Sequence, residues 1–288
     1  MQSFTLEFDR FRLELGRHTC IMGILNTTPD SFSDGGKFDT VETAVAQAEK
    51  LIAAGAHILD IGGESSRPFS EPVSEQEEMD RVIPVIESLA GRIEIPISID
   101  TVKSNVAREA VQAGARMIND ISAFEKDPDM VKVAAKKKVP VILMHMKGTP
   151  QTMQVEPNYD DLMLEITDYL ASRAALALEN GIEKNQIILD PGIGFGKTVR
   201  HNLVLIKHLE QIAGLGFPIL TGPSRKSFIQ HILSGKKNGA IGPDHRKTEY
   251  GTLAAVAASV MNGAHIIRVH DVETVQAFTQ IVDSIRNA

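Results

Sequence analysis

The chain of 288 residues has a single cysteine, no tryptophan and only 5% aromatic residues. A lone thiol, Cys20, cannot form an intramolecular disulfide, and within its apolar stretch it is expected to behave as a small buried hydrophobe. This cysteine usage is typical of a reducing compartment. We therefore expect a cytoplasmic protein.

Long apolar segments and excess positive charge are also lacking. No stretch approaches the ~20 apolar residues that span a bilayer, and charged residues interrupt residues 1–16, so a signal-peptide core is not expected there. The net charge of -7 gives no general attraction for nucleic acid or anionic membranes. We expect no nucleic-acid and no membrane partner, and any anion site must come from a local group of cations.

The chain does have the composition of a globular protein, with 43% hydrophobic and 23% charged residues. Within residues 1–17, apolar and polar residues alternate in two short runs, which predicts a small β-hairpin. Residues 18–288 suffice for one α/β barrel, because such barrels use about 250 residues as a single domain. The predicted organisation is an N-terminal hairpin packed on one barrel domain.

Short β-rich runs alternate with longer stretches of helical period along the rest of the sequence. Eight such runs can be counted: Cys20–Leu25, Ile58–Ile61, Pro96–Ile99, Met117–Ile118, Pro140–Met144, Ile187–Leu189, Pro218–Leu220 and Ile266–Val269. Strands alternating with helices form a parallel sheet, and eight such units that close on themselves give a (β/α)8 TIM barrel. Gly55, Gly114 and Gly263 each follow an Ala-rich stretch, as suits a helix end before a strand.

Polar residues end the eight runs. They are Asn26, Asp60, Asp100, Asn119 with Asp120, His145, Asp190, Thr221 and, just beyond Val269, His270. The carboxyl ends of barrel strands meet at one mouth, where barrel enzymes have their sites, so these residues are expected to converge. For Asp60, Asp120 and Thr221 we favour a plainer role as turn or helix-cap residues.

Eight motifs carry a resemblance to a known family. They read GILNTTPDSFSDGG at 23–36, DIGGESSRP at 60–68, SIDT at 98–101, INDI at 118–121, LMHM at 143–146, DPGIGFGK at 190–197, SRKS at 224–227 and RVHD at 268–271. In this order they resemble the dihydropteroate synthases, which are pterin-binding enzymes. The resemblance implies condensation of a dihydropterin methyl diphosphate with 4-aminobenzoate in folate synthesis, with Mg²⁺ as cofactor and both substrates small molecules.

A pterin ring has a guanidine-like edge and a carbonyl, which carboxylates, an amide and a cation can satisfy in a dry pocket. By resemblance, Asp190 and Asn119 hold the pyrimidine edge, Lys226 reaches the carbonyl side and Asp100 lies near the pterin. Phe195 is expected to line the same pocket. By resemblance, Asp100 and Lys226 are also expected to serve in catalysis, together with the loop residues Asp34 and Arg67.

Diphosphate requires cations and hydrogen-bond donors. Arg268 and His270 stand two apart at the end of the last run, where both side chains share a face, and a guanidinium can grip phosphate bidentately. By resemblance, Asn26 and Ser66 are expected to bind the diphosphate as well. Asn26 is the expected metal ligand, since Mg²⁺ takes few protein ligands when it also binds substrate phosphates.

The expected 4-aminobenzoate site lies partly on two loops, 27–36 and 62–72, which are rich in Gly, Ser, Thr and Pro. By resemblance these loops close over the substrates and bring Asp34, Ser66 and Arg67 to the reacting centre, so Asp34 and Arg67 join Asp100 and Lys226 in catalysis. A helix is expected to begin near Ser227. The free amides and the dipole at its N-terminal end can hold the benzoate carboxylate, and the serine can also serve as the N-cap. The remaining contacts expected for this substrate are Phe32, Arg67, Pro68 and Phe195.

Two residues depart from the family pattern, which usually reads Ser-Thr-Arg-Pro-Gly where this chain has Ser66 for the threonine and Phe69 for the glycine. Both bear on affinity for 4-aminobenzoate and for the sulfonamides that mimic it. Two alternatives stay open, a pterin-dependent corrinoid methyltransferase and a non-catalytic barrel homologue. The first has no need of an anion pocket, and the second should have lost Asn26, Asp100, Lys226 or Arg268, all four of which are present. The resemblance further implies a homodimer through the later barrel helices.

Overall fold

Eight parallel strands form the central sheet of the computed structural model, which describes residues 1–28, 37–65, 70–153, 157–235 and 241–288. The strands are β3 (Cys20–Asn26), β4 (Ile58–Gly62), β5 (Ile97–Asp100), β6 (Met117–Asp120), β7 (Val141–Met144), β8 (Ile187–Asp190), β9 (Leu220–Thr221) and β10 (Ile266–Val269). They are ordered β8-β7-β6-β5-β4-β3-β10-β9, and a bridge between Leu189 and Ile219 closes the sheet. The predicted barrel is confirmed, and each predicted run lies within two residues of its strand.

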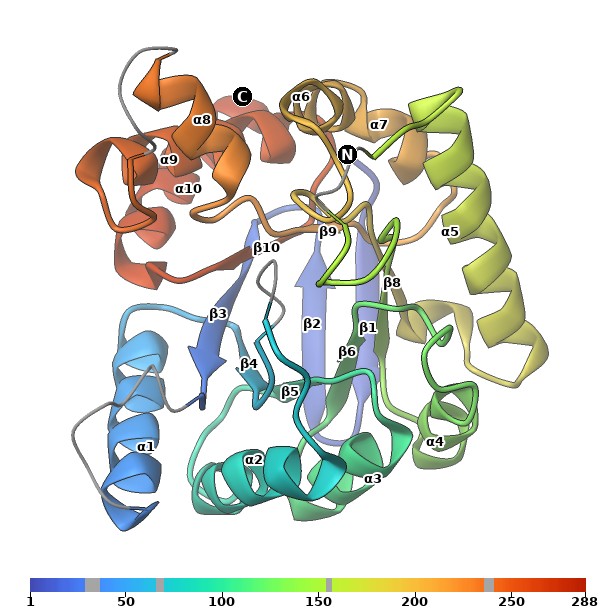
Figure 1. The fold of residues 1–288 in the computed structure, drawn as a ribbon, viewed down its shortest axis with the longest axis vertical. Coiled ribbons are helices and arrows are strands. Elements are labelled where there is room, and N and C mark those ends of the chain that lie inside the picture. Colours follow the sequence, from blue (N-terminus) through green and yellow to red (C-terminus); the bar gives the residue numbers. More distant parts are fainter. Residues whose placement is uncertain (29–36, 66–69, 154–156, 236–240) are drawn as a thin grey trace.

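Helices form a ring around these strands (Figure 1). They are α1 (Lys37–Ala53), α2 (Glu75–Ala90), α3 (Ser104–Ala113), α4 (Met130–Lys137), α5 (Leu162–Glu179), α6 (Val199–Lys207), α7 (Leu209–Ala213), α8 (Ser227–Ser234), α9 (Arg246–Met261) and α10 (Val272–Arg286). Because helices cover the outside of the sheet and side chains fill its inside, both faces of each strand are buried. Gly55, Gly114 and Gly263 have φ of 101°, 133° and 114°, as expected of glycines that end helices.

Side chains inside the barrel change in character from one end to the other. Near the amino ends of the strands they form an apolar layer, made of Met22, Ile58, Met117, Ile142, Ile188, Leu220 and Ile266. Two residues further along, inward positions are occupied by Asp60, Asn119, Asp190 and Arg268, because alternate residues of a strand face the same side. Polar groups therefore gather at the carboxyl end of the barrel.

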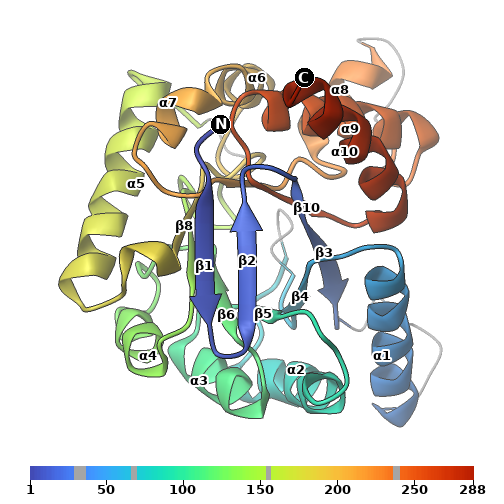
Figure 2. The ribbon, with the colours of Figure 1, turned by 180° about the vertical axis from the view of Figure 1, so that it is seen from behind.

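The predicted hairpin closes the opposite end. Its strands β1 (Phe4–Phe8) and β2 (Phe11–Leu15) pair with Leu6 opposite Leu13, and it lies in front of the barrel in Figure 2. Leu6, Phe8 and Leu15 are buried in the same cluster as the apolar layer of the barrel, and so is Cys20. Burial raises the pKa of the Cys20 thiol to about 12, so this thiol is unreactive at neutral pH.

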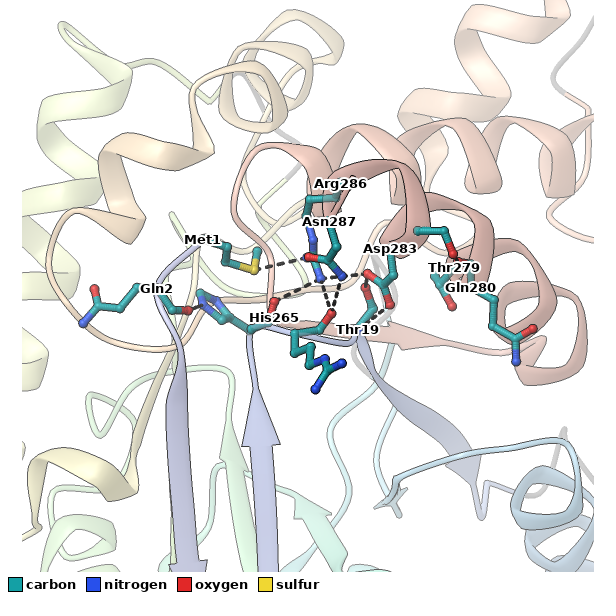
Figure 3. Close-up of polar contacts among 12 residues, drawn as sticks. Met1, Gln2, Thr19, His265, Thr279, Gln280, Asp283, Arg286 and Asn287 are labelled. Atoms are coloured by element: carbon teal, nitrogen blue, oxygen red, sulfur yellow. Dashed lines mark hydrogen bonds and ion pairs between the residues drawn. The ribbon is translucent and has the colours of Figure 1, made fainter.

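A polar cluster ties the C-terminal helix to the start of the barrel (Figure 3). The Asp283 carboxylate accepts hydrogen bonds from the Thr19 amide and hydroxyl, each at 2.7 Å, and pairs with Arg286 at 2.8 Å. Arg286 in turn donates to the carbonyls of Gly16 and Arg17 at 3.0 Å. The last helix thus fixes the segment that joins the hairpin to β3. Within the described ranges, no helix combines the length and apolar character needed to cross a membrane.

Two histidines that directly precede strands make the same contacts. The His57 amide donates to the Ile21 carbonyl at 2.8 Å, and its Nδ1 accepts from the Ile21 amide at 3.1 Å. His265 repeats both contacts with Ile219, at 2.8 and 3.1 Å. An Nδ1 that accepts carries no proton, so both rings are neutral in the folded state. Burial lowers the pKa of both imidazoles.

This arrangement predicts that acid weakens the fold through His57 and His265. Below the unfolded pKa of about 6.5 the unfolded chain binds protons that the folded histidines do not, so stability is lost as pH falls through that range. Each histidine contributes up to about 1.4 kcal/mol per pH unit. Urea unfolding at pH 8.0, 6.5 and 5.5 measures the effect, and the double variant His57→Gln, His265→Gln should show a shallower dependence. An unchanged dependence in that variant would contradict the assignment.

Candidate active site

A pocket of about 340 Å³ opens among the carboxyl ends of the strands. It is lined by Asp100, Asn119, Ile121, Met144, Asp190, Ile193, Phe195, Gly222, Lys226 and Arg268. Apolar walls with a few convergent polar groups are typical of ligand sites. The structure therefore brings together the five residues that were predicted for pterin binding. A larger open depression, of about 970 Å³, lies between α2 and α3 away from the strand ends.

Arg268 is held at the centre of this pocket by two carboxylates. Its Nε donates to Asp60 and its Nη2 donates to Asp100, each at 2.6 Å. Burial alone would lower the pKa of the guanidinium, but the two carboxylates outweigh burial and the pKa is raised. At Asp100 burial is the larger effect, so the pKa of that carboxyl rises to about 7 although Arg268 opposes the rise.

Asp60 was predicted to be a turn or cap residue, and this prediction is wrong. Its side chain is completely buried within β4 and faces the barrel interior, where it accepts from Arg268 and from Asn119 Nδ2 at 3.0 Å. The interpretation of Thr221 is also wrong, since its hydroxyl is buried and has no hydrogen-bond partner among the residues that the structure describes. Asp120 does form the predicted turn, accepting from the amides of Ser122 and Phe124 at 2.8 Å.

Asp190 is fixed by the glycine-rich segment that follows β8. Its Oδ1 accepts from the Gly192 amide at 2.7 Å. Gly192 has φ of 70°, and a Cβ there would lie 1.9 Å from the His145 carbonyl oxygen, so the close approach of the two loops requires glycine. Gly194 similarly admits the Lys226 side chain, whose Cδ would lie 2.7 Å from an added Cβ. Burial raises the pKa of Asp190 to about 6.

Lys226 provides a cation on the other side of the pocket. It is the N-cap residue of α8, and its Nζ lies 3.9 Å from the centre of the Phe195 ring, a favourable cation–π distance. Burial first, and then the neighbouring Arg268, lower the pKa of Lys226 to about 8. The ammonium is still mostly protonated at pH 7 and can donate to a ligand acceptor.

Lys197 was given no role by the sequence. Only 3% of the residue is exposed, and its Nζ donates to the Phe195 carbonyl at 2.8 Å and contacts His145 Nδ1 at 3.1 Å. Burial lowers the pKa of Lys197 to about 7 and that of His145 to about 3. This pair lies behind the loop that carries Phe195, so it supports the pocket wall. The sequence feature that could have indicated a role for Lys197 is its position at the end of the glycine-rich motif at 190–197.

The expected diphosphate and metal residues lie at different depths. His270 is beyond the end of β10, where its Nδ1 is 3.0 Å from Ser224 Oγ, whereas Arg268 lines the pocket itself. A joint anion site for the two stays a prediction. Asn26 is half-buried as the last residue of β3, next to Gly62 in register. Over the described residues, no group of three His, Cys, Asp or Glu side chains could hold a metal ion.

Ser227 is the first residue of α8 and is exposed. The helix begins where it was predicted to begin, but the cap position belongs to Lys226, so the alternative of a serine N-cap is wrong. Five further predicted residues, Phe32, Asp34, Ser66, Arg67 and Pro68, lie outside the described residues, as does Phe69. Their expected roles in catalysis and in 4-aminobenzoate binding stay predictions.

The family of pterin-binding enzymes matches residues 22–270 of this chain. The chain belongs to that family. It is 48% identical to the dihydropteroate synthase of Synechocystis sp. over 270 residues, which cover 94% of this chain and 91% of that protein. A Yersinia pestis dihydropteroate synthase structure with a sulfonamide drug matches at 42% identity and a TM-score of 0.90, over 99% of this chain and 100% of the other. The Xanthomonas albilineans dihydropteroate synthase structure with 4-aminobenzoic acid matches at 41% identity and a TM-score of 0.90, over 100% of both chains.

These matches confirm the resemblance that the eight motifs carry. The relatives are transferases of one reaction, and they match this chain over nearly its full length. They favour the synthase over both alternatives that the sequence left open, the corrinoid methyltransferase and the non-catalytic homologue. The pocket agrees with this choice, because it keeps its carboxylates and cations.

Removing the central guanidinium is predicted to destabilise the protein in a pH-dependent way. Arg268→Ala leaves two buried carboxylates without their cation and should lower the free energy of unfolding by about 3 kcal/mol at pH 8. The loss should shrink by pH 5.5, because a carboxyl with an already raised pKa, such as Asp100, can then take up a proton. Chemical unfolding at the two pH values measures the difference.

Arg12→Ala is the matched control for that experiment. Arg12 also pairs with two carboxylates, Glu7 and Glu14, but all three side chains are more than half exposed. Exposed pairs contribute about 1 kcal/mol or less, so this variant should stay close to the wild type at both pH values. An Arg268→Ala effect no larger than that of Arg12→Ala would show that the central ion pairs do not stabilise the fold.

Proposed function

We propose that this chain condenses a (7,8-dihydropterin-6-yl)methyl diphosphate with 4-aminobenzoate to give 7,8-dihydropteroate and diphosphate. The observation that carries the proposal is the convergence of Asp100, Asn119, Asp190 and Lys226 beside Phe195 in one pocket at the barrel mouth. In a member of the pterin-binding enzyme family, this set complements both the donors and the acceptors of a pterin ring.

Recognition of the pterin follows from the chemistry of these side chains. The carboxylate of Asp190 and the amide oxygen of Asn119 accept hydrogen bonds, so they suit the guanidine-like edge of the ring. Lys226 donates, so it suits the ring carbonyl. Phe195 offers a flat apolar face on the same wall. Ile121 and Met144 add apolar lining that keeps the hydrogen bonds in a medium of low dielectric.

Catalysis by this site relies on electrostatics and positioning. Departure of diphosphate leaves positive charge on the pterin methylene, and a nearby Asp100 carboxylate stabilises that charge as it develops. The aniline nitrogen of 4-aminobenzoate is neutral and nucleophilic at pH 7, so the step needs no nucleophile from the protein. We assign Asp34 and Arg67 to the same centre as predictions that the family resemblance supports.

The diphosphate is proposed to bind Arg268, His270 and Ser66. Within the described residues the ion pairs of Arg268 use Nε and Nη2, which leaves Nη1 for a phosphate oxygen. Asn26 would supply one oxygen ligand to Mg²⁺, which fits an ion that takes most of its ligands from phosphate and water. When bound, Mg²⁺ neutralises charge on the leaving diphosphate.

The second substrate is proposed to bind beside the pterin, between Phe195 and the start of α8. The amides of the first helical turn and the helix dipole favour the benzoate carboxylate near Ser227. Phe32, Arg67 and Pro68 are the further contacts that we assign to it. The Yersinia pestis and Xanthomonas albilineans relatives were determined with a sulfonamide drug and with 4-aminobenzoic acid, which supports one pocket for both kinds of molecule here.

We also propose a cytoplasmic homodimer. Exposed apolar side chains lie on the three last helices, α8 to α10, namely Ile232, Leu233, Tyr250, Met261, Ile281 and Ile285. Apolar side chains that are exposed on neighbouring helices support a subunit contact there. The small-residue stretch 253–259 on α9 is compatible with the same contact.

Diphosphate release tests the proposed reaction directly. The purified protein is incubated with the pterin diphosphate and Mg²⁺, with and without 4-aminobenzoate, and released diphosphate and pteroate are quantified. We expect release to depend on the amine and to match pteroate one for one. Release without any pteroate, or no release with both substrates present, would exclude the reaction.

Asp190→Asn is predicted to weaken pterin binding by roughly 100-fold, on the scale of a lost hydrogen bond to a charged group. The Gly192 amide needs an acceptor, so the new amide must keep its oxygen toward Gly192 and turn its NH₂ group into the pocket. A donor then faces the donors of the pterin edge. Calorimetry with 6-hydroxymethylpterin measures the affinity.

Asp161→Asn serves as the control, because Asp161 caps α5 and is not among the residues that line the pocket, and asparagine caps equally well. It should bind the pterin like the wild type. Near-wild-type affinity in a folded Asp190→Asn variant would remove Asp190 from the site.

A further inference from the structure

We infer that Asp60 is a positioning residue that sets which atoms Asn119 and Arg268 present to the pterin pocket, and that it thereby determines discrimination between ligands with donors and ligands with acceptors on the pyrimidine edge. The inference rests on the proposed function, since it concerns the same pocket. Asp60 itself is not among the residues that line the pocket.

The position of Asp60 follows from the strand register. Asp60 lies opposite Ile24 on one side and Ser98 on the other, within the ladder of β3, β4 and β5. Its side chain is 0% exposed, so a ligand cannot reach it while the barrel is folded. A buried carboxylate is costly unless cations and donors satisfy it, and it therefore fixes the groups that do so.

A single oxygen of Asp60 orders two neighbours. Oδ2 accepts from Arg268 Nε at 2.6 Å and from Asn119 Nδ2 at 3.0 Å. The bond from Asn119 decides the orientation of its amide, because a flipped amide would place two oxygens against each other. The Asn119 oxygen is consequently the atom that is presented to the pocket. The bond from Arg268 holds the guanidinium plane, with Nη2 on Asp100 at 2.6 Å.

An asparagine by itself has no preference between its two orientations, since the oxygen and the NH₂ group are nearly equal in shape. Without Asp60 the amide could present either a donor or an acceptor to a ligand. A site that is preorganised to accept rejects ligands that bring a second acceptor, because two acceptors cannot share a proton. Asp60 therefore acts on selectivity through Asn119 without touching the ligand.

The other oxygen of Asp60 makes a conservative variant possible. Oδ1 is buried without a hydrogen-bond partner in the described part of the chain, and so is the hydroxyl of Ser98, its register neighbour. In Asp60→Asn the amide oxygen can replace Oδ2 as the acceptor for Arg268 and Asn119. The new NH₂ group then takes the place of Oδ1, which has no hydrogen-bond partner among the described residues, so no existing hydrogen bond is lost. Asp60→Ala removes the acceptor altogether.

The test compares two ligands that differ at one exocyclic group. The probes are 6-hydroxymethylpterin, with its 2-amino donor, and 6-hydroxymethyllumazine, with a 2-oxo acceptor at the same position. Dissociation constants for both are measured by calorimetry on the wild type, Asp60→Asn and Asp60→Ala, and folding is checked by chemical unfolding. The readout is the ratio of the two dissociation constants in each protein.

We expect the wild type to prefer the pterin, and Asp60→Asn to keep that ratio. In Asp60→Ala the ratio should fall by about tenfold or more, with a gain for the lumazine relative to the pterin. Where the alanine variant is recovered unfolded, Asp60→Val fills the space without an acceptor and should show the same fall.

A role in stability alone would weaken both ligands equally, so an unchanged ratio in Asp60→Ala overturns the inference. Loss of the ratio in Asp60→Asn also overturns it, because the charge rather than the acceptor would then be decisive. If the wild type binds no pterin, the proposed function fails and the inference fails with it. If the wild type binds the pterin and the ratio does not behave as expected in the variants, only the inference fails.

Discussion

The pocket depends on a guanidinium held between two carboxylates in the interior of a barrel. Arg268 bridges Asp60 and Asp100 at 2.6 Å, and around this bridge lie a third carboxylate, Asp190, and the ammonium of Lys226. Isolated charges at such depth would be strongly unfavourable, but the opposite signs lie side by side and compensate one another. Burial moves the pKa of three of these groups toward the neutral form, upward for Asp100 and Asp190 and downward for Lys226. The groups are thus oriented before a ligand arrives, which is the condition for electrostatic catalysis.

The barrel keeps this group of charges at one end because its interior is built in layers. The apolar layer, with the hairpin residues Leu6 and Leu15 beneath it, excludes water from the amino end of the strands. Two residues further along, the inward positions of β4, β6, β8 and β10 are polar, so the charges lie close to the mouth without being at the surface. Gly192 and Gly194 then let the loop after β8 approach closely enough to place Asp190 and to admit Lys226. The site is therefore a consequence of strand period and of glycine positions together.

Much of this could be predicted from the sequence, and the failures have physical reasons. The strands were found because apolar runs ending in polar residues mark buried parallel strands, and the pocket residues because those ends must converge. The prediction for Asp60 is wrong because a polar residue near the end of an apolar run can either form a turn or point into the barrel, and the local sequence does not distinguish the two positions. A signal was nevertheless present: Asp60 and Arg268 are both charged residues inside otherwise apolar strands, and each needs a partner of opposite charge. The glycine-rich motif draws attention to Lys197, but its burial could not be predicted, since that depends on how the loop after β8 packs against His145.

The raised pKa values fit a site that must bind a neutral ring and then stabilise a cation. A carboxyl with a pKa of about 6, as at Asp190, is protonated in only about one molecule in ten at pH 7. Little free energy is therefore needed to deprotonate it so that it can accept hydrogen bonds from the pterin. Burial raises the pKa of Asp100 to about 7, while the ion pair with Arg268 favours its ionised form. Positive charge that develops on the pterin methylene would favour the ionised form and so strengthen the interaction as the diphosphate leaves. An interaction between the Asp100 carboxylate and the developing charge stabilises the transition state more than the bound substrate, which is the requirement for raising the rate of the chemical step.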